Sequence, residues 1–207
     1  MLVILSYLQI FLNTNILSYR RVASNSYVVL CSQRPDIMPS SIYKVMNPCP
    51  CGYFTDPKKE CHCTPFQIQR YLSKISGPLL DRIDIHLEVP RLNLEHMTDK
   101  RRGEPSESVR KRVDKARTVQ KERYKKDGVY FNAHLESRDL EKHCILDKES
   151  EELLKLAILE LGISARAYDK ILRVGRTIAD LDGKETIEAH HISEAISYRS
   201  LDRNLWG

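Results

Sequence analysis

Residues 164–203 read SARAYDKILRVGRTIADLDGKETIEAHHISEAISYRSLDR, and this stretch decides how the C-terminal half of the chain folds. Between Ser164 and Gly183, apolar residues recur at the spacing of one helix face. Serine is a common N-cap, and glycine often ends a helix. A second apolar series, which includes Ile192, is predicted to begin at Thr186. The stretch therefore predicts two consecutive helices.

Two further helices are predicted upstream of this stretch. Ser106 is expected to cap a long basic helix that ends near Lys126. Another apolar series runs to Leu161 and is stopped by Gly162. We therefore expect residues 106–207 to form a small helical domain.

Residues 46–90 have a different character, with a cysteine-rich loop followed by mixed helix and strand signals. Thr64 and Gln67 are spaced as a capping box for a helix that runs to about Lys74. The alternating sequence IDIHLEV at 83–89 predicts a strand with one apolar face. This segment is expected to be a fragment of an α/β domain.

The remaining segments carry weaker signals. Residues 91–105 are polar and are expected to be a linker. SYVVLCS at 26–32 is compatible with a strand, and 33–41 contains two prolines and is typical of a loop. Residues 1–17 are apolar, but they are too short, and too often interrupted by polar residues, to predict a membrane span. They also lack the basic start of a signal peptide, so cytoplasm is the default expectation.

Composition sets broad limits on function. The chain has 207 residues, of which 42% are hydrophobic and 29% charged, and this is ordinary for one or two globular domains. A net charge of +5 permits contact with nucleic acid without arguing for it. The cysteines are too unevenly placed for a secreted disulfide scaffold.

Four cysteines form the pattern C-P-C-G-x8-C-H-C, with Cys49, Cys51, Cys61 and Cys63 as its members. Two such pairs can supply four thiolates to one tetrahedral Zn²⁺, although C-x-C is less diagnostic than C-x-x-C. Reduced metal-free thiols and disulfides remain alternatives. His62 could replace one cysteine, but a solvated histidine is the favoured interpretation. No nearby carboxylate is placed as a general base, so a metal here would be structural.

The segments 46–90 and 164–203 together resemble the Mg-chelatase-like AAA+ ATPases of the ComM/YifB type, in particular their C-terminal portion. The resemblance implies a mainly α fold. A lid-type helical bundle would follow a fragment of an α/β P-loop ATPase core with a cysteine-rich loop. The resemblance further implies that intact relatives resemble hexameric motors that use ATP and Mg²⁺ and act on DNA, with links to recombination, branch migration and natural transformation. The four cysteines match the cysteine-bearing version of the family's insertion.

The resemblance also implies roles for three residues. Asn47 matches the sensor-1 residue, although it could simply cap a loop. Arg82 matches the arginine finger that reaches the ATP of a neighbouring subunit, and the alternative is a salt bridge with Asp81 or Asp84. Arg166 matches the sensor-2 arginine, and the alternative is a solvated arginine at the start of a helix.

The sequence departs from the family at the phosphate-binding residues. It contains no G-x-x-x-x-G-K-[ST] loop and no apolar strand that ends in Mg²⁺-binding acidic residues. Residues 1–45, where these would lie, are expected to be unmatched and poorly ordered, as in a truncated gene product or one with a misassigned start. The strand at 83–89 is then expected to lack neighbours.

Three functions follow as hypotheses, and the sequence leaves open whether the chain is an enzyme. The first is a truncated AAA+ ATPase that cannot hydrolyse ATP alone but could offer Arg82 to intact subunits. The second is a non-enzymatic DNA- or protein-binding module built on the basic helix 106–126 and a zinc knuckle. The third is a pseudogene product without function.

Overall fold

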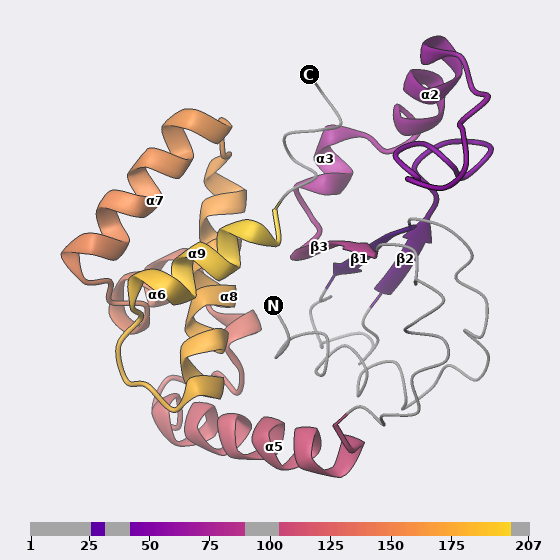
Figure 1. Cartoon of the computed structure of the whole chain (residues 1–207). Coiled ribbons are helices and arrows are strands. Elements are labelled where there is room, and N and C mark those ends of the chain that lie inside the picture. The colour runs from indigo at the N-terminus through magenta and orange to yellow at the C-terminus, as the bar shows by residue number, and fades with distance from the viewer. Residues whose placement is uncertain (1–25, 32–41, 90–103, 200–207) are drawn as a thin grey trace. The chain divides into compact units, whose positions relative to one another are not determined.

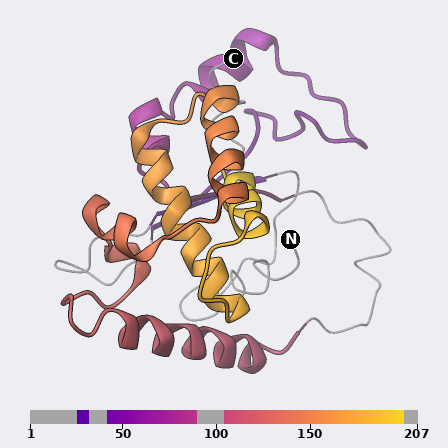
Figure 2. The ribbon, with the colours of Figure 1, turned by 90° about the vertical axis from the view of Figure 1, so that its left-hand side faces the viewer.

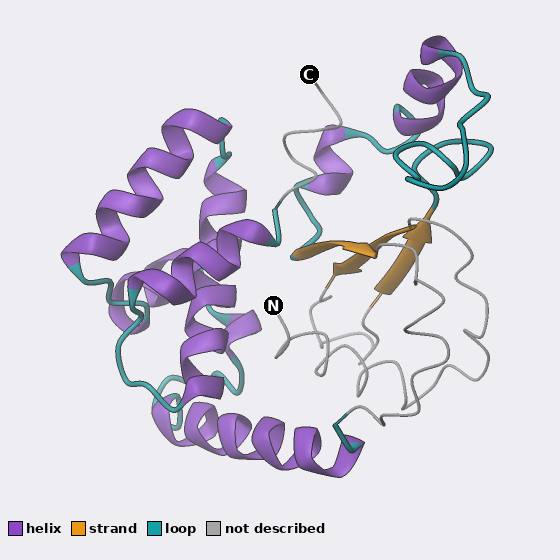
Figure 3. Cartoon of the chain, viewed as in Figure 1, coloured by secondary structure: helices purple, strands orange, loops and turns teal. Residues whose placement is uncertain are grey.

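The computed structural model describes residues 26–31, 42–89 and 104–199, and these form two compact units. We call residues 26–31, 42–89 and 198–199 the sheet unit, and residues 104–197 the helical unit. Figure 3 shows all strands of the described residues in the first unit and a purely helical arrangement in the second. Helices predominate, as the sequence predicts, and no helix among the described residues is long and apolar enough to cross a membrane.

The sheet unit is built on three strands, β1 (Ser26–Cys31), β2 (Ile42–Met46) and β3 (Ile85–Val89), in the order β2-β1-β3 (Figure 1). Both pairings are antiparallel, and Val28 of β1 lies opposite Leu87 of β3. The expectation that the strand at 83–89 lacks neighbours is therefore wrong. Antiparallel pairing explains why, because it needs none of the parallel strands of an ATPase core.

The N-terminal segment also differs from expectation. Residues 1–45 are predicted to be poorly ordered, yet β1 and most of β2 lie within them as paired strands. The prediction of a strand at 26–32 is confirmed. The apolar sequence VVL in β1 supplied that signal, while IYKV in β2 was too short to be decisive. The other residues of 1–45 lie outside the described residues.

Two short helices connect β2 to β3. The helix α2 (Pro65–Leu72) begins with the predicted capping box, because Thr64 Oγ1 accepts from the Gln67 N–H and Gln67 Oε1 accepts from the Thr64 N–H. The helix α3 (Gly77–Leu80) follows. A small core beneath them holds four buried residues with Tyr71 and Leu72 packed against it: Met46, Ile75, Leu80 and Ile83.

The strand β3 is more enclosed than its alternating sequence predicts. His86, on the predicted polar face, is only 1% exposed. Its backbone N–H donates to the carbonyl of Tyr198, and the Arg199 guanidinium donates to the carbonyl of Ile83. The two residues after the last helix therefore complete the sheet unit, and sequence periodicity alone does not reveal such an interaction.

The helical unit consists of five helices and one 3-10 turn, η1. The helix α8 contacts α5, α6, α9 and η1, and Figure 2 shows α5 crossing one end of it. The bounds are α5 (Ser106–Arg123), η1 (Asn132–His134), α6 (Ser137–His143), α7 (Lys148–Leu161), α8 (Ala165–Asp182) and α9 (Ala189–Ser197).

The helix α8 matches its prediction closely. Ser164 Oγ accepts from the Ala167 N–H, and Gly183 ends the helix at φ 75°. Inside the helix, Gly175 lets α9 approach, since a Cβ built there would lie 3.0 Å from Cδ1 of Ile192. The predicted stop of α7 at Gly162, which has φ 61°, is also confirmed.

Other boundaries differ from the predictions. Ser106 is the first residue of α5 rather than its cap, a place that Pro105 takes. The last helix begins at Ala189 and not at Thr186, because the buried Ile187 forms an extended bridge with Leu146. The short helix α6 was not predicted, and its seven residues are too few for a periodic signal.

A buried polar network joins α5, η1 and α8. The Asp180 carboxylate, fully buried, accepts from Arg123 at 2.5 and 3.0 Å, from Arg176 Nε at 3.1 Å and from Asn132 Nδ2 at 2.9 Å. The Tyr124 hydroxyl donates to Asn132 Oδ1 at 2.6 Å. A buried charge is tolerated only when it is paired and hydrogen-bonded, and Asp180 meets both conditions.

Candidate metal centre

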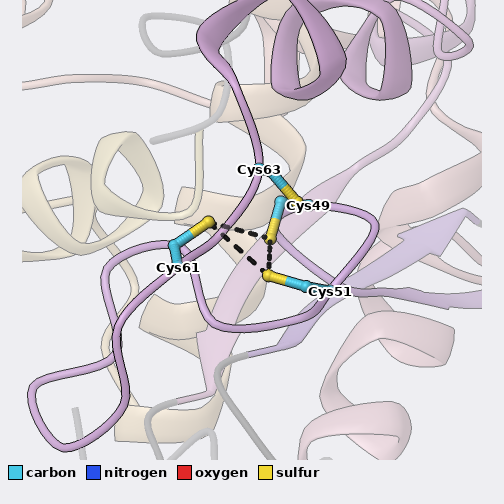
Figure 4. A group of neighbouring side chains, drawn as sticks. All are labelled: Cys49, Cys51, Cys61 and Cys63. Carbon is cyan, nitrogen blue, oxygen red and sulfur yellow. Dashed lines mark hydrogen bonds between the residues drawn. The ribbon is translucent and has the colours of Figure 1, made fainter.

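The four predicted cysteines converge on one point of the sheet unit (Figure 4). The Sγ atom of Cys49 lies 3.4 Å from that of Cys51 and 3.7 Å from that of Cys61, and Cys51 and Cys61 are 3.5 Å apart. Cys63 completes the group, because all four sulfur atoms lie within 4.8 Å of one another. The sequence therefore identified the complete set.

The first pair sits on a tight turn directly after β2. The Gly52 N–H donates to the carbonyl of Cys49 at 3.1 Å, and Gly52 has φ 81°, a conformation that favours glycine. The Phe54 N–H then donates to Cys49 Sγ at 3.4 Å. This backbone bond stabilises negative charge on the sulfur, as a thiolate ligand requires.

The second pair is positioned by the helix that follows it. Cys63 directly precedes Thr64, the N-cap whose capping box fixes the start of α2. His62, between the two ligands, is exposed and is not a member of the cluster. The preference for four cysteines over a histidine ligand agrees with this placement.

The thiols of the cluster hold their protons unequally. The pKa of Cys51 is lowered to about 6, chiefly by a hydrogen bond from the Tyr53 backbone. At Cys61 a hydrogen bond from the Cys63 backbone favours the thiolate. Burial and the neighbouring thiols of Cys51 and Cys49 outweigh that bond and raise the pKa of Cys61 to about 12. The cluster alone therefore cannot ionise fully at neutral pH, and a cation would be needed to hold four thiolates together.

The donor set fits Zn²⁺. Zn–S bonds of about 2.3 Å in a tetrahedron place sulfur atoms about 3.8 Å apart, close to the separations seen here. The cysteines are free thiols, which excludes disulfides between them in this structure. With all four positions filled by protein ligands, no site is left open for water or substrate, so Zn²⁺ would here hold two loops together.

Asn47 and Arg82 lie in the same unit as the cysteines. Asn47 is exposed directly after β2, two residues before Cys49. Arg82 is also exposed, on the turn that follows α3, and its backbone N–H donates to the carbonyl of Leu79. The buried residues Leu80 and Ile83 on either side hold that turn in place.

Arg166 lies in the helical unit, exposed on the first turn of α8. Ser164 caps this turn, and the buried Ala167 anchors it. A cation at the start of a helix is not stabilised by the helix dipole, which favours anions there. The same position suits an arginine that binds an anion together with the helix N-terminus.

A second group of potential ligands was not predicted: Asp182, His190 and His191, whose ligand atoms also lie within 4.8 Å of one another. Here the hydrogen bonds argue against a metal. His191 Nδ1 accepts from the Glu188 N–H at 2.9 Å, so in the neutral ring Nε2 carries the proton. Nε2 then faces Asp182 at 3.5 Å as a donor, and its proton occupies the position at which a cation would bind. His191 thus serves to cap α9.

Both units of the chain match models of known protein families. Residues 37–97 match the family model described as magnesium chelatase, subunit ChlI, and residues 103–199 match its C-terminal counterpart. The chain belongs to the Mg-chelatase-like family. The first match begins before residue 46 and includes all of β2, so the expectation that 1–45 is wholly unmatched is corrected.

Curated relatives agree with this assignment. The competence protein ComM of Haemophilus influenzae is 44% identical over 163 residues, which is 77% of this chain and 30% of the relative. YifB of Escherichia coli is 41% identical over 162 residues, or 77% of this chain and 31% of the relative. A relative from Mycobacterium bovis is 33% identical over 153 residues, or 74% of this chain and 30% of the relative. The chain thus spans about 30% of the length of these relatives.

Proposed function

We propose that this chain is the sensing and lid portion of a Mg-chelatase-like AAA+ ATPase that acts on DNA, braced by a structural Zn²⁺ in the four-cysteine centre. The observation that carries the proposal is the joint match of both units to one family, with the cysteine centre placed between β2 and α2. In this proposal Asn47 and Arg166 respond to the γ-phosphate, and Arg82 acts on the ATP of a neighbouring subunit in a ring.

The chemistry assigned to Arg82 is charge stabilisation. Phosphoryl transfer builds negative charge on the oxygens of the transferred group, and a guanidinium that arrives from a neighbouring subunit offsets it. Such a residue must be exposed yet held firmly at its base. Arg82 is exposed, and the buried Leu80 and Ile83 anchor its turn.

The phosphate loop and the Mg²⁺-binding acidic residues must come from another polypeptide segment, since these 207 residues contain neither. We therefore expect no ATP hydrolysis by the purified chain alone. Measurable turnover in that preparation, which a contaminating ATPase did not account for, would contradict the proposal.

A complementation assay tests the role of Arg82. A full-length ComM-type relative whose own arginine finger has been replaced by alanine is mixed with this chain, and ATP hydrolysis is followed. Wild-type chain should restore turnover at least about 10-fold, and Arg82→Ala should not, because only the former supplies the guanidinium. The matched control is Arg70→Ala, another exposed arginine of the sheet unit, which should restore turnover like wild type.

The metal is tested separately. Metal analysis of the purified chain should give about one zinc per chain, and Cys61→Ser should lose most of it because three ligands bind more weakly than four. Cys144→Ser, which removes a buried cysteine of the helical unit, should keep its zinc. Equal zinc in all three proteins would place the metal elsewhere.

A further inference from the structure

The helix α5, together with the turn after it, carries more positive charges than its acidic residues can pair with. Residues 106–126 contain three acidic side chains against a larger basic set. The basic residues are Arg110, Lys111, Arg112, Lys115, Arg117, Lys121, Arg123, Lys125 and Lys126. Among the described residues, the fold already engages some of these cations and leaves others without a partner.

Two arginines are fully engaged. Arg112 donates two hydrogen bonds to the carboxylate of Glu104, at 2.6 and 2.8 Å. Arg123 donates two to the buried Asp180. Both guanidinium groups already have a carboxylate partner with two hydrogen bonds, so we do not count them among the cations open to a partner.

Three further cations have weaker partners at the surface. Lys111 pairs with Glu107 at 3.0 Å and Lys125 with Glu122 at 3.9 Å, and all four of these side chains are largely exposed. Such exposed pairs contribute little to stability and are readily exchanged for another anion. The Arg117 guanidinium lies 5.6 Å from the centre of the Phe131 ring, a placement that leaves its charge unneutralised.

Four cations remain, and we call them the free-cation set: Arg110, Lys115, Lys121 and Lys126. All are exposed, and none has a hydrogen bond or ion pair within the part of the chain that the structure describes. On a helix, Arg110, Arg117 and Lys121 fall within about 20° of one line, since seven and eleven residues are close to whole numbers of turns. That line is about 16 Å long at 1.5 Å per residue.

The helix presents these cations on a rigid base. Its opposite face is buried at Val109, Ala116 and Gln120, and its C-terminal end is fixed by the Arg123–Asp180 pair. The backbone that carries the charges is already ordered, so the conformational cost of binding is confined to the exposed side chains.

The chemistry of this face distinguishes a phosphate backbone from a protein partner. Protein interfaces depend on buried aromatic or aliphatic anchors near their centre. The large apolar side chain exposed on α5 is Val119, at 41%, and it lies about 180° around the helix from Arg110. It is a neighbour of Lys115, four residues before it, but the line of Arg110, Arg117 and Lys121 has no exposed large apolar side chain. A face with cations but no apolar anchor suits a polyanion whose charges repeat along a line.

We propose that α5, through the free-cation set and Arg117, binds the phosphate backbone of DNA without regard to base sequence. The choice of DNA rests on the proposed function, whereas the choice of α5 rests on its charges and burial alone. Salt bridges to phosphate oxygens, with release of counterions, would supply the binding energy.

The test compares two variants of the full chain that carry the same net charge. In the first, Arg110→Gln, Lys115→Gln, Lys121→Gln and Lys126→Gln are combined. In the second, four exposed cations on other helices or loops of the same unit are replaced instead: Arg138→Gln, Lys148→Gln, Lys155→Gln and Lys184→Gln. Binding to a labelled DNA duplex, and to one of its strands, is measured by fluorescence anisotropy over a range of salt concentrations. Circular dichroism checks that each variant is folded.

We expect the wild-type chain and the second variant to bind alike, and the α5 variant to bind at least about 10-fold more weakly at low salt. On duplex, the slope of log affinity against log salt should also become shallower, by about 0.9 for each phosphate that the variant no longer neutralises. Equal binding by both variants would overturn the assignment to α5 while leaving a DNA role in place. No DNA binding by the wild-type chain would overturn the assignment as well. Neither DNA-binding result changes what the complementation assay for Arg82 measures, which is ATP hydrolysis. Failure of the α5 proposal can therefore be distinguished from failure of the proposed function.

Discussion

Gly52 occupies the tightest point of the first cysteine turn, where φ is 81° and the residue is buried. A β-branched side chain there is strained by about 1–2 kcal/mol. We therefore predict that Gly52→Val lowers zinc affinity by about 5- to 30-fold, measured by competition with a chromogenic chelator.

The control for this prediction is Gly128→Val. Gly128 has a similar φ of 69° and open space around a built Cβ, but it lies in the helical unit. The Gly128→Val substitution should lower the free energy of unfolding by a similar amount and leave the zinc affinity unchanged. If both variants lose zinc equally, general destabilisation and not the cysteine turn is responsible.

Proton release provides a second test of the cysteines. The thiol of Cys61, with a pKa raised to about 12, keeps its proton at neutral pH and must lose it to bind zinc, whereas Cys51, with a pKa of about 6, is already mostly ionised. Zinc binding at pH 7 should therefore release protons, and affinity should fall as pH falls, more steeply below about 6 where Cys51 also becomes protonated. Calorimetry in two buffers of different ionisation enthalpy measures the release, and identical heats would contradict it.

The roles of individual residues were predictable where the spacing of a sequence motif determines its local structure. The four cysteines and the Thr64–Gln67 capping box follow from spacing, because few other arrangements satisfy those side chains. The group of Asp182 and two histidines was missed because its members gather only after α8 and α9 pack together. The roles of Asn47, Arg82 and Arg166 remain predictions, since they depend on a nucleotide and on a neighbouring subunit.

At the scale of elements, α5 is paired with α8 by two hydrogen bonds from Arg123 to the buried Asp180 carboxylate. Removing this carboxylate leaves the buried Arg176 and the partly buried Arg123 without their shared partner. We predict that Asp180→Ala destabilises the chain by about 3–5 kcal/mol, measured by urea unfolding.

A nearby acidic residue provides the control for Asp180. Glu185 is exposed, and only its backbone carbonyl is used, as an acceptor for Arg176 at 2.6 Å. Glu185→Gln should change stability by no more than about 0.5 kcal/mol. A comparable loss in both variants would show that the network contributes little beyond general surface charge.

Long elements were more predictable than their neighbours. The helices α7 and α8 have clear apolar periodicity, and each ends at a glycine with positive φ, so their limits followed from sequence. The pairing of the strands into a sheet did not follow from sequence, because β1 and β2 pair through backbone groups that any sequence possesses. The start of α9 shifted because Ile187 is buried in an extended conformation, a tertiary effect.

For the whole molecule, division into two units predicts that metal loss has a local effect. All four cysteines of the centre lie in the sheet unit, and the Asp180 network lies in the helical unit. Treatment with a strong chelator should raise amide hydrogen exchange across residues 49–63 and leave α8 protected. Loss of protection in both regions would show that the metal supports the entire chain.

The dependence of three donors on one carboxylate also constrains how this lineage can change over time. A chain that lost Asp180 first would pass through a destabilised form in which the buried Arg176 and the partly buried Arg123 have no carboxylate partner. Loss of both arginines first would likewise leave the buried Asp180 carboxylate without a cationic partner, so the three positions must change together. Among homologues Arg123, Arg176 and Asp180 should therefore be replaced together and not one at a time.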